Sequence, residues 1–145
     1  MSTTALNLLN SKNDRSIFTV TPDQTTYEGL QLMAAKDIGA VAVMEEGRLI
    51  GILTERDYAR KLVLHGKTSR HTPVFDTMNR DFPRVGPGTS IDECMKLMTD
   101  LRFRYVAVMD DGEFLGLIST GDILKHIIVS QQENIEHLKR YIRGL

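Results

Sequence analysis

Apolar residues along this chain recur at two spacings, one typical of β-strands and one typical of α-helices. A short apolar stretch at 18–20 ends in a proline-containing turn, and apolar residues then recur at helical spacing from Leu30 to Ile38. Two aliphatic runs, 40–44 and 49–53, flank a glycine-containing turn, as in a β-hairpin. This half predicts the order strand, helix, strand, strand, and a second helix follows.

The other half of the chain repeats this pattern. A short strand at 84–85 precedes a helix over 94–101, which starts behind a Ser-x-x-Glu capping box at Ser90. Two further strands, 105–109 and 114–118, flank a second glycine-containing turn. The same five elements are therefore predicted twice.

The two halves align letter by letter. Val20–Leu62 falls on Val85–Ile127 without a gap, and the four residues Val41–Met44 are identical to Val106–Met109. A unit of about 50 residues buries too little apolar surface to be stable alone. We therefore predict an α+β fold in which two βαββα repeats pack sheet to sheet with pseudo-twofold symmetry.

Both ends of the chain predict additional helices. Residues 5–9 form a short amphipathic pattern, and residues 123–142 are longer than a closing helix needs. The longer segment carries one seam, which needs a cover from the N-terminal segment or from another subunit: Leu124, Ile128, Gln131, Ile135, Leu138 and Ile142. The predicted divisions are an N-terminal arm 1–15, repeat 16–64, linker 65–73, repeat 74–129 and C-terminal extension 130–145.

A polar cluster closes the second strand of each hairpin. Gly51–Asp57 reads GILTERD and falls on Gly116–Asp122, which reads GLISTGD. A hydroxyl and a carboxylate three positions apart can cap the helix that follows, or they can contact a ligand. Capping needs only one of the two groups, so their repetition in both copies favours ligand contact.

Composition and charge narrow the function. The net charge of −1 provides no global basic field, so we do not expect nucleic-acid binding. A single cysteine, Cys94, excludes an intrachain disulfide and favours a reducing compartment, and it lies on the apolar side of its helix, where we expect burial. No apolar run has the roughly 20 residues of a membrane span, and residues 1–13 lack a secretory pattern, so we expect a cytoplasmic protein.

No catalytic signature stands out. The four histidines show no metal-ligand spacing with each other or with the cysteine, so we expect no metal. A Ser/His/Asp signature, a P-loop and GxGxxG are missing from the sequence, so we expect no catalytic residues.

A tandem of this order, with Gly-apolar-apolar-Thr/Ser-x-x-Asp at the end of each unit, resembles the CBS domain pair, or Bateman module, over about residues 16–129. The resemblance implies two clefts related by pseudo-twofold symmetry. Many members bind AMP, ADP, ATP, S-adenosylmethionine or NAD there. It also implies a flat homodimer of four repeats.

The resemblance assigns a role to each matching residue. It implies that Asp57 and Asp122 accept hydrogen bonds from ribose hydroxyls and that Thr54 and Ser119 reach phosphate. The starts of the hairpin strands supply the surface for adenine. The residues implied for the first site are Thr19, Thr21, Ala40, Val41, Thr54, Arg56 and Asp57. Those for the second are Arg84, Gly86, Arg104, Tyr105, Val106, Ser119, Thr120 and Asp122.

The two copies differ in their basic residues. Arg56 is replaced by Gly121, and Gly39 corresponds to Arg104. Because an arginine fork suits phosphate, the clefts should differ in preference. We expect one to hold a mononucleotide such as AMP, and the other to accept the same ligand or a longer one such as NAD, whose second phosphate could use Arg56 or Arg60.

Two functions remain open from the sequence. The first is a stand-alone regulatory module that senses energy state or a redox cofactor and passes its output to an effector protein. The second is a structural adaptor that has vestigial clefts and acts through protein contacts. Ligand-induced stabilisation distinguishes them.

Overall fold

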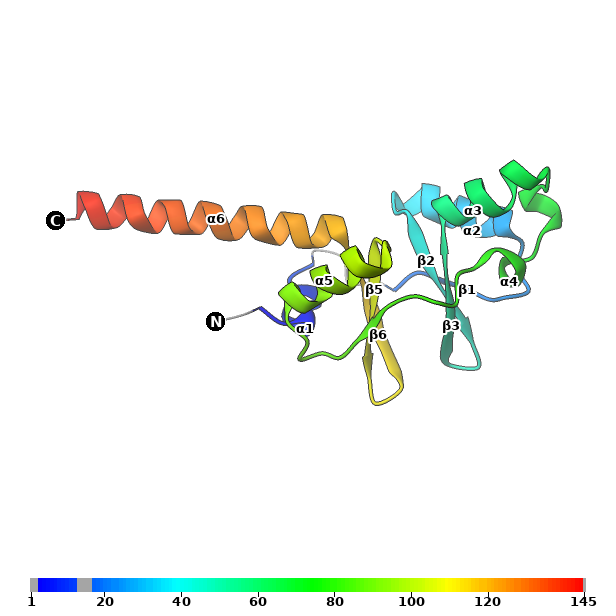
Figure 1. Cartoon of the computed structure of the whole chain (residues 1–145), viewed down its shortest axis with the longest axis horizontal. Coiled ribbons are helices and arrows are strands. Elements are labelled where there is room, and N and C mark those ends of the chain that lie inside the picture. Colours follow the sequence, from blue (N-terminus) through cyan, green and yellow to red (C-terminus); the bar gives the residue numbers. More distant parts are fainter. Residues whose placement is uncertain (1–2, 13–16, 145) are drawn as a thin grey trace.

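Two three-stranded sheets form the body of the chain in a computed structural model that describes residues 3–12 and 17–144 (Figure 1). The first repeat consists of β1 (Thr19–Val20), α2 (Thr26–Lys36), β2 (Ala40–Glu45), β3 (Arg48–Thr54) and α3 (Glu55–Lys61). The second consists of β4 (Arg84–Val85), α5 (Ile91–Leu101), β5 (Tyr105–Asp110), β6 (Glu113–Ser119) and α6 (Thr120–Arg143). The predicted element order is confirmed in both repeats.

Four further short helical elements lie outside this pattern in the described residues. The helix α1 (Ala5–Ser11) precedes the first repeat. The connector between the repeats contains two 3-10 turns, η1 (Val63–His65) and η2 (Ser69–His71), and the short helix α4 (Val74–Thr77). The predicted N-terminal helix is therefore present.

Both sheets share one topology. The first strand of each runs parallel to the second, and the second pairs antiparallel with the third. The hairpins turn at Glu46-Gly47 and Asp111-Gly112, where φ is 51°, 77°, 50° and 83° in order. Two consecutive positive φ angles are the pattern of a type I′ turn, which matches the strand twist and explains the glycine in each turn.

The apolar residues form three packed clusters. One lies under the helices of the first repeat and includes Met33 and Leu53, and another lies under those of the second and includes Cys94 and Ile118. The third joins the two sheets face to face, and its buried members are Ala40, Ala42, Ile52, Phe82, Ala107 and Phe114. The predicted sheet-to-sheet packing is thus confirmed, and Cys94 is buried as expected.

The two terminal helices differ in how they pack against the repeats. Leu8 and Leu9 of α1 are buried in the core of the second repeat, together with Ile123 at the start of α6. Beyond its first turns α6 leaves the body and projects away from it (Figure 1), and every described residue from 131 onward is exposed. The helix α1 therefore covers the second repeat but leaves the seam of α6 open.

Candidate ligand-binding site

The repeated polar motifs cap the helices that follow them. The Thr54 hydroxyl accepts a hydrogen bond from the Asp57 N–H at 3.0 Å, while the Asp57 carboxylate accepts from the Thr54 N–H at 3.2 Å and hydroxyl at 2.8 Å. Ser119 and Asp122 exchange the same two backbone bonds at 3.0 and 2.9 Å. The argument that capping does not need both groups is wrong, because this reciprocal box uses hydroxyl and carboxylate together.

The first of these carboxylates is part of the internal structure. Asp57 is 8% exposed, and the Lys61 ammonium lies 3.4 Å from its second oxygen. The same ammonium donates to the carbonyls of Thr77 and Met78, both at 3.1 Å. Asp57 therefore fixes the end of the connector through a lysine on its own helix.

The second carboxylate is more open. The Asp122 side chain is 24% exposed, and its partner is Lys12, whose ammonium lies 3.1 Å away. Lys12 follows the last residue of α1 and also donates to the Leu117 carbonyl at 3.2 Å. The position that matches Lys61 is His126 in this repeat. Asp122 thus depends on a residue from outside its own repeat.

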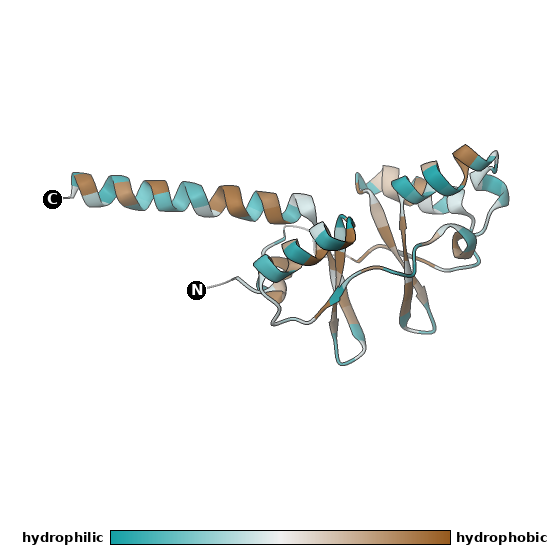
Figure 2. Ribbon diagram, in the orientation of Figure 1, coloured by the Kyte–Doolittle hydropathy of each residue, from teal (hydrophilic) through white to brown (hydrophobic). Residues whose placement is uncertain are grey.

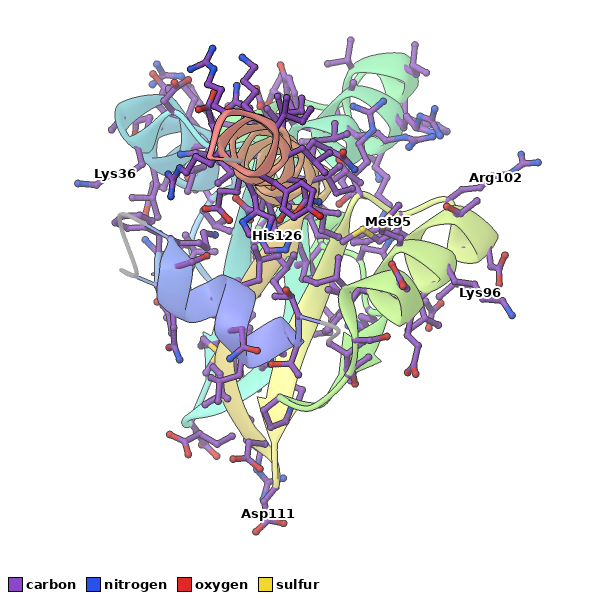
Figure 3. All side chains as sticks on the ribbon, turned by 90° about the vertical axis from the view of Figure 1, so that its left-hand side faces the viewer. Lys36, Met95, Lys96, Arg102, Asp111 and His126 are labelled. Atoms are coloured by element: carbon purple, nitrogen blue, oxygen red, sulfur yellow. The ribbon has the colours of Figure 1, made fainter. Side chains whose placement is uncertain are left out.

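A cavity of about 630 Å³ lies beside Asp122. Its apolar wall includes Phe18, Ile38 and Ala40 of the first repeat. Its polar lining comes from the second repeat and the N-terminal segment, through Lys12, Ser119, Asp122, Lys125 and His126, and from the first repeat through Lys36 and Asp37. Figure 3 looks along α6 and shows His126 projecting from its underside. The cavity therefore combines an apolar wall, a carboxylate and basic groups, contributed by both repeats.

A tyrosine reaches across the boundary between the repeats. Tyr105 lines the cavity, and a Cβ built on Gly39 would lie 2.6 Å from its hydroxyl oxygen, so the two residues are in close contact. Burial raises the pKa of the Tyr105 hydroxyl, as do the carboxylates of Glu55 and Asp122, while Arg104 lowers it. This hydroxyl therefore stays protonated and can donate a hydrogen bond.

The cavity brings together four of the residues named from the sequence. Tyr105, Ser119 and Asp122 of the predicted second site line it, and Ala40 of the predicted first site joins them from the other repeat. The other predicted site residues do not line this cavity, namely Thr19, Thr21, Val41, Thr54, Arg56, Asp57, Arg84, Gly86, Arg104, Val106 and Thr120.

Packing explains several of these positions. The side chains of Val41 and Val106 are fully buried in the helix-side cores, so they face away from the cavity. The Arg84 guanidinium stacks on the Phe82 ring at 4.0 Å. Arg56 is exposed on α3. A ligand in the cavity would therefore meet none of these four side chains.

Sequence reasoning missed the basic residues of the cavity. Lys125 and His126 follow Asp122 by three and four positions on α6, where helical spacing places them on the same side. That spacing was available from the sequence. No comparable signal exists for Lys12, because its contact with Asp122 joins opposite ends of the chain.

Comparison with known proteins identifies the family to which this chain belongs. The family model for the CBS domain matches the chain twice, at residues 13–64 and 74–129. The chain belongs to the CBS domain family, as a tandem pair. It is 35% identical over 151 residues to the mitochondrial CBS domain-containing protein CBSX3 of Arabidopsis thaliana, and the match covers 99% of this chain and 73% of the relative.

Solved structures show the same CBS pair. A protein of Burkholderia ambifaria described as a signal-transduction protein with CBS domains superposes with a TM-score of 0.85 at 45% identity, covering 89% of this chain and 96% of that one. The CBS-domain protein ATU1752 of Agrobacterium tumefaciens gives 0.79 at 34% identity, covering 86% and 98%. The relatives are thus CBS-domain proteins, and signal transduction is the role described for one of them.

The described residues contain neither a helix that could span a membrane nor a cluster of metal-ligating side chains. Across residues 3–12 and 17–144, no helix has the length and apolar character needed to cross a membrane. The described part of the CBS pair also contains no group of three or more His, Cys, Asp or Glu side chains placed to hold a metal ion. The cytoplasmic location stays a prediction, because the Arabidopsis relative is mitochondrial.

Proposed function

We propose that this CBS pair binds an adenine nucleotide in the cavity beside Asp122 and acts as a regulatory module without catalysis of its own. The observation that carries the proposal is the combination, in one cavity of about 630 Å³, of an apolar wall from the first repeat with the Ser119–Asp122 pair of the second. That volume lies in the range of small-molecule sites. The ligand class follows from the family resemblance.

Each part of the ligand has a matching surface. Phe18, Ile38 and Ala40 offer an apolar wall to a base. The Asp122 carboxylate has acceptor oxygens for ribose hydroxyls. The Lys12 ammonium already lies 3.1 Å from this carboxylate, so ribose hydroxyls that bind Asp122 compete with Lys12. A phosphate near Ser119 would then give that ammonium a new anionic partner.

The cavity also suggests how binding is transmitted. Its walls come from both repeats and from the end of α1, so a ligand that fills it favours one packing of these parts over others. An effector protein that contacts the pair would sense the difference. AMP, ADP or ATP fits this arrangement. The use of Arg56 or Arg60 by NAD stays a prediction, since neither residue lines the cavity.

Calorimetry with AMP, ADP, ATP, NAD and S-adenosylmethionine tests the proposal. We expect binding of at least one of them with one ligand per chain. Asp122→Asn should weaken it at least about tenfold, which corresponds to roughly 1.4 kcal/mol. The matched control is Asp111→Asn in the exposed β5–β6 turn, which should bind like the wild type. No binding at millimolar concentration, or equal effects of the two substitutions, would overturn the proposal.

The exposed helix α6 supports the alternative function, an adaptor that acts through protein contacts. Thermal unfolding separates the two functions. A ligand that binds only the folded state at 100 times its dissociation constant adds about 2.7 kcal/mol of stability, whereas an adaptor with vestigial clefts shows no shift.

A further inference from the structure

The helix α6 carries a row of large aliphatic side chains that its own chain does not cover. Each is between 50% and 70% exposed, and the row consists of Leu124, Ile128, Ile135, Leu138 and Ile142. Figure 2 shows apolar bands recurring along α6 out to its free end. An exposed apolar row of this length is typical of an interaction surface.

The row follows a heptad pattern. From Leu124 the steps alternate between four and three residues, with Gln131 at the one polar position. In heptad notation Ile128, Ile135 and Ile142 occupy position a, and Leu124, Gln131 and Leu138 occupy position d. A repeat of 3.5 residues keeps one seam facing a partner helix along its whole length.

The body of the chain uses a different side of the same helix. Ile123 is buried in the core of the second repeat, and Ile127 packs against that core. Leu124 and Ile128, each one position further along, remain exposed. The seam is therefore free from Leu124 to Ile142, and nothing in the described body covers it.

We propose that the seam is the interface with a second copy of this chain, in a parallel two-stranded coiled coil. Isoleucine at every a position with leucine at the apolar d positions is the combination that favours parallel dimers over larger assemblies. In this arrangement each a residue faces its own counterpart, and the two Gln131 amides meet in one layer. A single polar layer fixes the register, at some cost in stability.

The flanking residues also favour the parallel arrangement. Lys125 and Lys139 occupy position e, and Asn134 occupies position g between them. In parallel helices Lys139 of one copy faces Asn134 of the other, which is a neutral partner. In antiparallel helices e positions face each other, so Lys125 would meet Lys139 and repel it.

Sedimentation of the full chain tests the interface. We expect self-association at micromolar concentration and a smaller assembly for Ile135→Lys, because the substitution places two charges in one buried layer. The matched control, His137→Lys, adds the same side chain at an exposed position outside the seam and should assemble like the wild type. A monomeric wild type, or an Ile135→Lys variant with the same assembly as the wild type, would overturn the proposal.

A second variant, expected to strengthen the interface, distinguishes loss of the seam from misfolding of Ile135→Lys. Gln131→Leu replaces the polar layer by leucine, so the dimer should tighten by about tenfold or more. An unchanged or weaker dimer would contradict the seam, because a residue outside an interface cannot strengthen it in this way.

Disulfide cross-linking then distinguishes the orientations. Ile142→Cys should form a covalent dimer in a glutathione redox buffer, because the two end residues meet only in a parallel pair. In an antiparallel pair residue 142 faces residue 124 of the partner subunit, at the other end of the helix, and no cross-link forms. The matched control is Arg140→Cys, which lies outside the seam. Cys94 is buried and does not interfere.

Discussion

The two repeats of this CBS pair use the same capping box and connect it to different surroundings. In the first repeat Asp57 is almost fully buried, and a lysine one turn further along its own helix ties it to the connector. In the second repeat Asp122 is partly exposed beside a cavity, and its lysine is the residue that follows the N-terminal helix. The shared motif therefore builds a helix start in both copies, and only its neighbours decide which carboxylate a ligand can reach.

The repeats also differ where each hairpin begins. Gly39 and Ala40 in the first correspond to Arg104 and Tyr105 in the second. The larger tyrosine extends toward the first repeat, and its ring meets Phe103 edge to face at 6.3 Å. Small residues in one copy thus leave space that a large residue from the other copy partly fills.

The largest difference between the two repeats should appear in the stability lost when each capping aspartate is replaced. Asp57→Ala removes the capping box, the Thr54 hydrogen bond and the Lys61 contact, so we expect the free energy of unfolding to fall by about 3 kcal/mol. Asp122→Ala removes a more exposed pair and should cost about 1 kcal/mol. Urea denaturation followed by circular dichroism measures both, with Asp100→Ala at an exposed position of helix α5 as the control. Equal losses would show that the two boxes are equivalent.

A second test addresses the lysine that distinguishes the repeats. Lys12→Met should tighten adenosine binding by about tenfold, because ribose no longer competes with the ammonium for Asp122. The same variant should weaken ATP binding by a similar factor, because the phosphates lose a cation. Calorimetry with both ligands measures the two effects, and Lys96→Met at an exposed position of helix α5 is the control. Parallel changes for both ligands would contradict the displacement of Lys12.

The contact across the repeat boundary gives a smaller effect. Gly39→Ala brings a Cβ to 2.6 Å from the Tyr105 hydroxyl oxygen and should lower the free energy of unfolding by about 1–2 kcal/mol. With Tyr105→Phe the nearest ring carbon is 4.0 Å away, so the double variant should regain most of that loss. Additive losses in the double-mutant cycle would place the strain elsewhere.

The smallest expected effect is a pH dependence. Burial raises the pKa of Tyr105 above 10.0 in the folded chain, with further upward contributions from Glu55 and Asp122 and a downward one from Arg104. Above the pKa of the unfolded chain, the folded state keeps the Tyr105 proton that the unfolded state loses, so the free energy of unfolding falls as pH rises. Well below that pKa the free energy of unfolding does not depend on this group. Denaturation between pH 8 and 11 should show a shallower fall for Tyr105→Phe. An identical slope would contradict this account.

Local patterns in the sequence predicted most of the fold. The hairpins followed from aliphatic runs around Gly47 and Gly112, and the start of α5 followed from the capping box at Ser90. The strands differ by a residue at their ends, because pairing extends β2 to Glu45 and β3 to Thr54 while β1 starts at Thr19. The repetition of the whole pattern then predicted that the two sheets pack face to face.

The surroundings of the site could not be predicted in the same way. The contact of Lys12 with Asp122 and that of Lys61 with the connector carbonyls depend on where long side chains end in three dimensions. Such contacts leave no period in the sequence. The motif letters are nearly alike in both copies, so they could not show that one carboxylate is buried and the other lies beside a cavity. The roles of both in ligand binding stay predictions.

One unbroken helix connects the cavity to the far end of the molecule. Asp122 and Lys125 line the cavity in the first turns of α6, which continues to Arg143. At 1.5 Å per residue its 24 residues form a rod about 36 Å long. A tilt of about five degrees at the cavity would therefore move the far end by roughly 3 Å. The helix has the geometry of a lever arm, so a ligand that tilted its first turns would produce a displacement large enough for a neighbouring protein to detect.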